Sequence, residues 1–264
     1  MPLSGSFGAL LLRGLLAGLI AGLLAGVVGN FVGEPAVDAA IAIEEAAAPP
    51  AEHSHDSGVA HEVSTEHTHG DEAVVSRPWQ RFGQFLASAL AGMAFGVIVA
   101  TAAHYVRRFS SLSGGRLVLG LGLAGWVAVV AVPFFKYPAN PPAVGDPETI
   151  NDRTLLWVAA VVLGLVAVAV GGYLWKALRA QPESFRLIAA VAGFGLVVTV
   201  GYVLLPGVNE VGADFPATLL WEFRAASLAV STTLWVSIGL AFAALTEWST
   251  RRSTAVPEVA ATPG

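Results

Sequence analysis

Six long apolar segments constrain this chain more than any other feature of its sequence. Each has about 20 residues with almost no charge in its middle, which is the length that an α-helix needs to cross a hydrocarbon core of about 30 Å. Lipid offers no hydrogen-bond partner to the backbone, and a helix satisfies its own backbone groups. The expected spans are approximately residues 10–33, 84–106, 116–135, 154–176, 186–206 and 219–246. We therefore predict an all-α integral membrane protein with six transmembrane helices in a single domain over residues 10–250, with five helices as the alternative.

The composition agrees with a membrane protein. Hydrophobic residues make up 55% of the chain and charged residues only 12%, with a mean hydropathy of +0.67, whereas soluble domains carry roughly 25% charged residues. The chain has no cysteine, which excludes disulfides and thiolate metal sites. The first apolar segment is too long for a signal-peptide core and lacks a basic leader, so we expect it in the mature protein.

The first apolar segment carries a row of glycines. They recur every fourth residue at Gly14, Gly18, Gly22 and Gly26, so a helix places them on one face. Small residues let helix backbones approach closely in lipid, where little else draws helices together. The row predicts that this face packs against another helix. Gly33-Glu34-Pro35 is expected to end the helix, with Glu34 at the membrane boundary.

A histidine-rich segment follows, within a loop expected over residues 36–78. Five of the six histidines fall in seventeen consecutive positions, and imidazole and carboxylate groups bind transition metals. The candidate metal ligands are His53, His55, Asp56, His61, His67, His69 and Asp71. A short helix over Ala36–Ala48 is expected to end at Pro49-Pro50, and the remaining polar stretch has no apolar run to pack. We expect it to be disordered and to order around a cation. The alternative is an acidic linker in which the histidines have no role.

The charge of this loop excludes one class of partner. Between Glu34 and Glu72 the chain has ten acidic residues and no lysine or arginine. A surface this acidic argues against binding to nucleic acid.

The distribution of basic residues predicts the orientation in the membrane. With six spans both termini lie on one side, which carries nine of the 14 lysines and arginines, while the other side carries five. The positive-inside rule places the more basic side in the cytoplasm. Residues 1–9 and a disordered tail over residues 251–264 are then cytoplasmic, and the histidine-rich loop faces outward.

A proline-rich connector lies between the third and fourth spans. Its four prolines restrict the backbone between Lys136 and Glu148, so it is expected to hold its polar side chains in near-fixed relation; a plain exposed loop is the alternative. No span has an ionisable residue in its middle, although ion pathways usually do. The path is then lined by hydroxyls and backbone carbonyls, or a partner completes it. Candidate entrance residues near the outer ends are Glu34, Lys136, Asn140, Asp146, Glu210 and Glu222.

Three features together resemble the cobalt transporter subunit family CbtA. They are the glycine-rich first helix closing in Gly33-Glu34-Pro35, the histidine-bearing loop, and the run Phe134-Phe135-Lys136-Tyr137-Pro138-Ala139-Asn140-Pro141-Pro142. The likeness covers roughly residues 10–250. It implies a membrane component of a cobalt uptake system linked to cobalamin synthesis, with a small single-span partner, CbtB, that has its own histidine motif. Cobalt comes from the resemblance alone, because the ligand types do not separate Co²⁺ from Ni²⁺ or Zn²⁺.

The expected function is that of a membrane subunit of a transition-metal uptake transporter whose outward-facing histidine-rich loop captures the cation. A non-transporting metal sensor or chaperone is the alternative. We expect no enzymatic activity, because no nucleophile–base pair is visible and histidines in a flexible loop are not preorganised for catalysis. We expect no permanently bound cofactor, since the divalent cation is cargo. The partners are membrane lipid, the CbtB-like subunit and, as a further option, a second copy of the chain, and the location is the plasma membrane.

Overall fold

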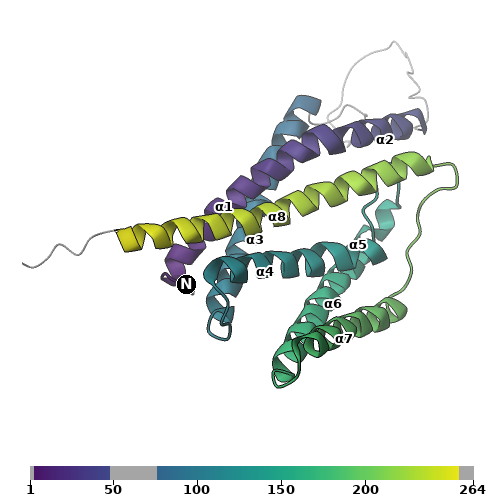
Figure 1. The fold of residues 1–264 in the computed structure, drawn as a ribbon. Helices are drawn as coiled ribbons and strands as arrows, with labels where there is room; N and C mark the ends of the chain where they lie inside the picture. Colours follow the sequence, from purple (N-terminus) through teal and green to yellow (C-terminus); the bar gives the residue numbers. More distant parts are fainter. Residues whose placement is uncertain (1–2, 48–75, 256–264) are drawn as a thin grey trace, which may run out of the picture.

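The computed structural model describes residues 3–47 and 76–255 of the chain. These residues form long helices that cross one another at varied angles (Figure 1). The candidate ligands between His53 and Asp71 lie outside the described residues, so the metal site predicted there stays a prediction.

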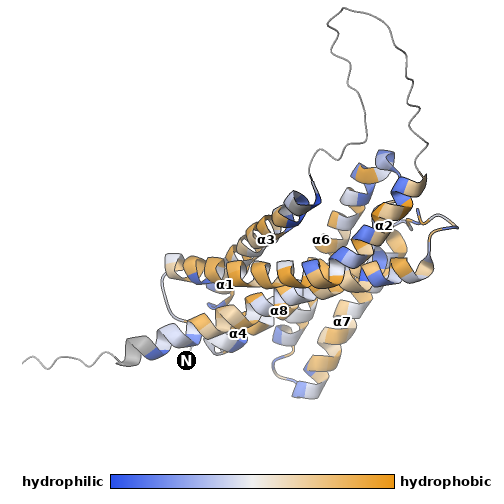
Figure 2. Ribbon diagram, turned by 90° about the horizontal axis from the view of Figure 1, so that it is seen from above, coloured by the Kyte–Doolittle hydropathy of each residue, from blue (hydrophilic) through white to orange (hydrophobic). Residues whose placement is uncertain are grey.

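The described residues contain six helices long and apolar enough to cross a membrane, which confirms the predicted fold class. Their bounds are Phe7–Ala47, Trp79–Val106, Gly114–Lys136, Pro147–Ala177, Glu183–Leu204 and Ala217–Arg251. Hydrophobic residues cover the helices along most of their length, and hydrophilic residues gather toward the helix ends (Figure 2).

The first helix does not end at Gly33-Glu34-Pro35, so that expectation is wrong. Helix α1 (Phe7–Val28) continues through a π-helical turn, η1 (Gly29–Gly33), into α2 (Glu34–Ala47). Together they have 41 residues, about 62 Å at 1.5 Å per residue. That is about twice the hydrocarbon thickness, so the chain extends well beyond one membrane span as a helix. The short helix expected over Ala36–Ala48 is the end of this element.

A second wide turn precedes a proline in the third span. Here α4 (Gly114–Trp126) passes through η2 (Val127–Ala131) into α5 (Val132–Lys136). Pro35 and Pro133 are each the second residue of the helix that follows the π turn. In a regular α-helix the ring of a proline clashes with the carbonyl four residues earlier. The wider turn moves that carbonyl away, so the helix continues instead of stopping.

The glycine row of α1 packs against α3 (Arg77–Val106), as the spacing predicted. A Cβ added at Gly14 would lie 2.4 Å from Gly96 O, and one added at Gly18 would lie 2.1 Å from Gly92 O. No side chain fits at these distances, so the two backbones meet directly.

The last span, α8 (Ala217–Ala255), lies across α1 and α4 and is the long yellow helix in Figure 1. The side chains of Leu10, Val118, Ile238 and Phe242 are fully buried where these helices meet. This is the core of the molecule.

The fourth and fifth spans form a peripheral pair. A short 3₁₀ turn, η3 (Pro147–Thr149), leads into α6 (Ile150–Ala177), which is followed by α7 (Glu183–Leu204). Gly164 of α6 packs on η2, where its Cβ would lie 2.3 Å from Ala128 O. Helix α7 has no buried residue.

Candidate functional site

The entrance residues predicted from sequence lie at one end of the molecule, where α2 approaches α3 and where residues 137–149 and 205–216 connect helices (Figure 1). We call this the connector end. The structure places Glu34 in one polar cluster, and Glu210 with the backbone of Asp146 in a second. Lys136, Asn140 and Glu222 lie outside both clusters.

The first cluster is a four-residue ion-pair network between α2 and α3. Glu34 Oε2 accepts hydrogen bonds from Arg77 Nη2 at 3.0 Å and from Arg81 Nε at 3.2 Å. Arg81 Nη2 also donates to Asp38 Oδ2 at 3.2 Å, and Arg77 Nη2 forms an ion pair with Asp38. The side chain of Glu34 is only 13% exposed, which strengthens its pairing. The network ties the last helix before residue 48 to the first helix after residue 75.

The other three members of this cluster, Asp38, Arg77 and Arg81, were not among the residues predicted from the sequence. A signal was available, since Glu34 and Asp38 are four residues apart and so are Arg77 and Arg81. Residues four apart share one helix face, so two acidic and two basic residues flanking one loop could have been paired.

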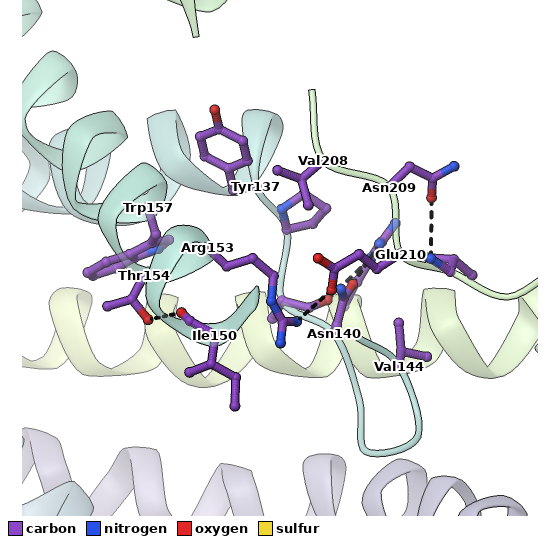
Figure 3. Close-up of a pocket in the computed structure, with 14 residues that line it drawn as sticks. Tyr137, Asn140, Val144, Ile150, Arg153, Thr154, Trp157, Val208, Asn209 and Glu210 are labelled. Atoms are coloured by element: carbon purple, nitrogen blue, oxygen red, sulfur yellow. Dashed lines mark hydrogen bonds and ion pairs between the residues drawn. The ribbon is translucent and has the colours of Figure 1, made fainter. Parts of the chain in front are cut away.

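The second cluster is centred on Glu210 (Figure 3). Its Oε2 pairs with Arg153 Nη1 at 3.3 Å and accepts from the backbone N–H of Asp146 at 3.1 Å. Its Oε1 accepts from Thr149 Oγ1 at 2.7 Å. Both carboxylate oxygens are therefore engaged by groups at the start of α6. Glu210 holds the 205–216 segment against that helix end.

The proline-rich connector is held by contacts from two helices and the 205–216 segment. Arg224 of α8 donates to Ala139 O at 3.2 Å and to Asn140 Oδ1 at 3.0 Å. Lys136 Nζ donates to Tyr202 O of α7 at 2.9 Å, and Tyr137 Oη donates to Pro206 O at 2.8 Å. These bonds favour the fixed connector over the plain exposed loop.

A cavity of about 520 Å³ lies between the connector, the start of α6 and residues 208–211. Its charged lining residues are Arg153, Glu210 and Arg224, and Tyr137 and Asn140 also line it. Arg153 and Glu210 point toward each other within it (Figure 3). Burial raises the pKa of Tyr137, so its hydroxyl stays a donor. The buried Arg153 Nε has no hydrogen-bond partner among the described groups. With two guanidinium groups against one carboxylate, the lining carries a net positive charge, which is unfavourable for a cation.

Two further predicted side chains belong to neither cluster, although the backbone N–H of Asp146 joins the second. Glu222 is exposed on α8 and makes no hydrogen bond or ion pair with the residues of either cluster. Asp146 caps η3 through its Oδ1, which accepts the Glu148 N–H at 2.9 Å. Across the described ranges no three or more His, Asp or Glu side chains come close enough to share a metal ion.

Comparison with known proteins identifies the family. No curated protein and no solved structure matches the chain. The family described as "probable cobalt transporter subunit (CbtA)" matches residues 7–247, nearly the whole chain. The chain therefore belongs to the CbtA family of probable cobalt transporter subunits, and its six apolar helices make it a multi-pass membrane protein.

Proposed function

We propose that this chain is the membrane subunit of a Co²⁺ uptake transporter in which the histidine-rich segment captures the cation outside and the connector end admits it. Family membership supports cobalt and transport. The ion-pair network of Glu34, Asp38, Arg77 and Arg81 is the observation that carries the rest of the proposal. It joins the helices on either side of the histidine-rich segment, so both anchor points of that segment are held at the connector end.

Tethering gives the histidines a defined task. A ligand-rich segment fixed beside an entrance holds bound metal close to that entrance. The tether thereby raises the effective concentration of the metal at the entrance. It does not lower the barrier to crossing hydrocarbon, which the helices must do. Capture and passage are then separate steps, carried by different residues.

The proposed orientation has both termini in the cytoplasm. The nine-to-five division of basic residues supports it. Single cysteines at Ser57 and Ser253 should differ in their labelling by an impermeant thiol reagent on intact cells. Only the cysteine at Ser57 should react. Equal labelling from outside would overturn the six-span orientation.

A small single-span subunit resembling CbtB is the proposed partner. No span has an ionisable residue in its middle, which supports the need for a partner subunit to complete the ion path. The alternative function is that of a membrane metal sensor or chaperone that does not transport. Co²⁺ uptake into proteoliposomes that contain this chain, alone and with the small subunit, separates the two functions.

Replacing His53, His55, His61, His67 and His69 together by Ala tests the capture step. We expect a lower apparent affinity for Co²⁺ and a nearly unchanged maximal rate, because only capture is lost. Lowering the pH to about 5.5, below the imidazole pKa of about 6.5, should bring the wild type toward the variant, since protonated rings do not bind metal. Uptake rates over a range of Co²⁺ concentrations at both pH values measure this.

The five-histidine variant is also the control for the pH experiment, because its uptake should change little when the pH is lowered to about 5.5. Wild-type uptake by the variant at limiting Co²⁺ would show that the histidines do not capture metal. Loss of all uptake at saturating Co²⁺ would show that they form part of the path itself.

A further inference from the structure

A second, smaller cavity lies beside Glu34 and is lined by residues of the π turn η1, α2, α3 and α8. Its volume is about 210 Å³, which is enough for several water molecules. Four of its lining residues carry side-chain oxygens: Glu34, Gln84, Ser227 and Ser231. Its only charged lining residue is Glu34, whereas the larger cavity is lined by two guanidinium groups and one carboxylate. Of the two cavities, only this one has no guanidinium group in its own lining, which makes it the less unfavourable of the two for a cation.

Some of the oxygens around this cavity have no hydrogen-bond partner among the described residues, although Glu34 Oε2 is paired with Arg77 and Arg81. Gln84 Oε1 is buried and accepts no hydrogen bond from any described group, which is unfavourable for a buried acceptor. The Arg77 and Arg81 bonds to Glu34 all reach Oε2, and Oε1 has no partner within residues 3–47 and 76–255. The two guanidiniums also pair with Asp38, so the network around Glu34 is electrically balanced.

The two serines behave differently from their neighbours. In membrane helices a hydroxyl commonly donates to the carbonyl four residues earlier, as Thr233 Oγ1 does to Ala229 O at 2.8 Å in the same helix. No hydrogen bond to another described group involves Ser227 or Ser231. These serines are four residues apart on one face of α8 and both line the cavity.

The π turn shapes the cavity. A π turn holds one more residue than an α turn, which rotates the following helix face by about 100°. Glu34 follows the turn directly and thereby lines the cavity while it pairs with α3. A Cβ at Gly29 would lie 2.4 Å from Gln84 Nε2, so only glycine leaves room for this amide. Such turns occur frequently at functional sites.

We infer that Glu34, Gln84, Ser227 and Ser231 form a binding site for a partly hydrated divalent transition-metal cation, the first site inside the helices. This inference rests on the proposed function and specifies where the captured cation goes next. Carboxylate, amide and hydroxyl oxygens bind such a cation less tightly than a set of imidazoles. Weak binding suits passage, since a site on a path must release what it binds.

Equilibrium binding of radioactive Co²⁺ tests the site without any need for transport. The parent is the full chain with the five histidines His53, His55, His61, His67 and His69 changed to Ala, purified in lipid nanodiscs. Gln84→Met keeps the side-chain length and removes the amide oxygen. We expect Gln84→Met and Ser231→Ala each to weaken Co²⁺ binding at least tenfold. Gln181→Met, at the exposed turn between α6 and α7, is the matched control and should bind as the parent does.

Gly29→Ala provides a second arm that removes no oxygen. Its methyl group would displace the flexible end of Gln84 rather than backbone, so the fold should persist while Co²⁺ binding weakens. Thermal unfolding of each variant, followed by circular dichroism, verifies folding, and Ser231→Ala carries the test should Gln84→Met unfold.

The outcomes separate this site from the proposed function. Loss of Co²⁺ binding in Gln84→Met, Ser231→Ala and Gly29→Ala, but not in Gln181→Met, supports the site even if proteoliposomes show no uptake. A parent that binds no Co²⁺, or a folded Ser231→Ala or Gln84→Met variant that binds as the parent does, overturns the site even if uptake is observed.

Discussion

The α1–α3 pair and the α6–α7 pair both use glycines, but in different ways. Between α1 and α3 the close approaches are to backbone on both sides: a Cβ at Gly18 would lie 2.1 Å from Gly92 O, and one at Gly92 would lie 2.2 Å from Gly18 O. Between α6 and α7 the glycines Gly193 and Gly201 face the ends of leucine side chains. The first pair contributes buried residues to the core, whereas α7 has no buried residue.

The difference shows which part of the molecule can adjust. Backbone atoms in direct contact cannot move aside, so the separation of α1 and α3 follows from the absence of Cβ atoms. Leucine side chains can change rotamer, so the α6–α7 contact tolerates small changes. The Glu34 cavity lies at the end of this rigid pair, between α3 and the π turn that continues α1, which suits a site that must hold several oxygens in place.

Gly18→Leu should have the largest effect of the substitutions considered. The leucine side chain would overlap the backbone of α3 at Gly92, so we expect a loss of about 3 kcal/mol or more in the free energy of unfolding. Gly22→Leu should behave similarly, because its Cβ would lie 2.2 Å from Ser88 O. Folded yield and thermal unfolding in detergent measure the loss.

Gly120→Leu is the matched control for this substitution, since nothing lies within 4 Å of a Cβ there. Leu19→Ala, at a half-buried position of α1, should also cost less than Gly18→Leu. An unchanged folded yield for Gly18→Leu and Gly22→Leu would show that the glycine face is not a packing surface.

Glu210→Gln should have an intermediate effect that is confined to the attachment of the peripheral pair. It removes the charge that pairs with Arg153 and turns one acceptor into a donor, which should cost about 1–2 kcal/mol. We expect faster amide hydrogen exchange near Asp146, because its backbone N–H donates a hydrogen bond to Glu210. Exchange in α1 and α3 should be unchanged. Exchange measured by mass spectrometry would detect it.

The exposed Glu222 supplies the control for that substitution, since Glu222→Gln should alter neither region. If Glu210→Gln accelerated amide hydrogen exchange equally in α3 and near Asp146, the α1–α3 and α6–α7 pairs would not be independent.

Gly201→Ala should have the smallest effect. Its Cβ would lie within 2.4 Å of two atoms at the end of Leu163, and that side chain can rotate away, so we expect less than about 1 kcal/mol. The thermal unfolding midpoint compared with that of Gly18→Ala gives the contrast between the two pairs. A larger loss for Gly201→Ala than for Gly18→Ala would reverse our assignment of the rigid and adjustable pairs.

Much of the fold could be read from local pattern. Long apolar segments must become helices in lipid because the backbone has no other hydrogen-bond partners there, so the existence and order of the six spans were predictable, although their exact ends were not. The glycine row also predicted a packing face from local spacing, because residues four apart share one face of a helix. Its partner was not predicted, although α3 carries Ser88, Gly92 and Gly96 at the same spacing of four. That spacing could have identified it.

The remaining features depend on contacts between residues far apart in the chain. Pro35 normally marks a helix end, but here a π turn packed against α3 and α8 carries the helix past it. Glu34 pairs with arginines 43 and 47 residues away, and no local preference encodes such a pairing. The oxygens of Gln84, Ser227 and Ser231 come from two other helices, and they form one cavity only because α1, α3 and α8 pack together at that depth. Hydropathy and spacing act within one helix, whereas a site of this kind is created by the packing of three.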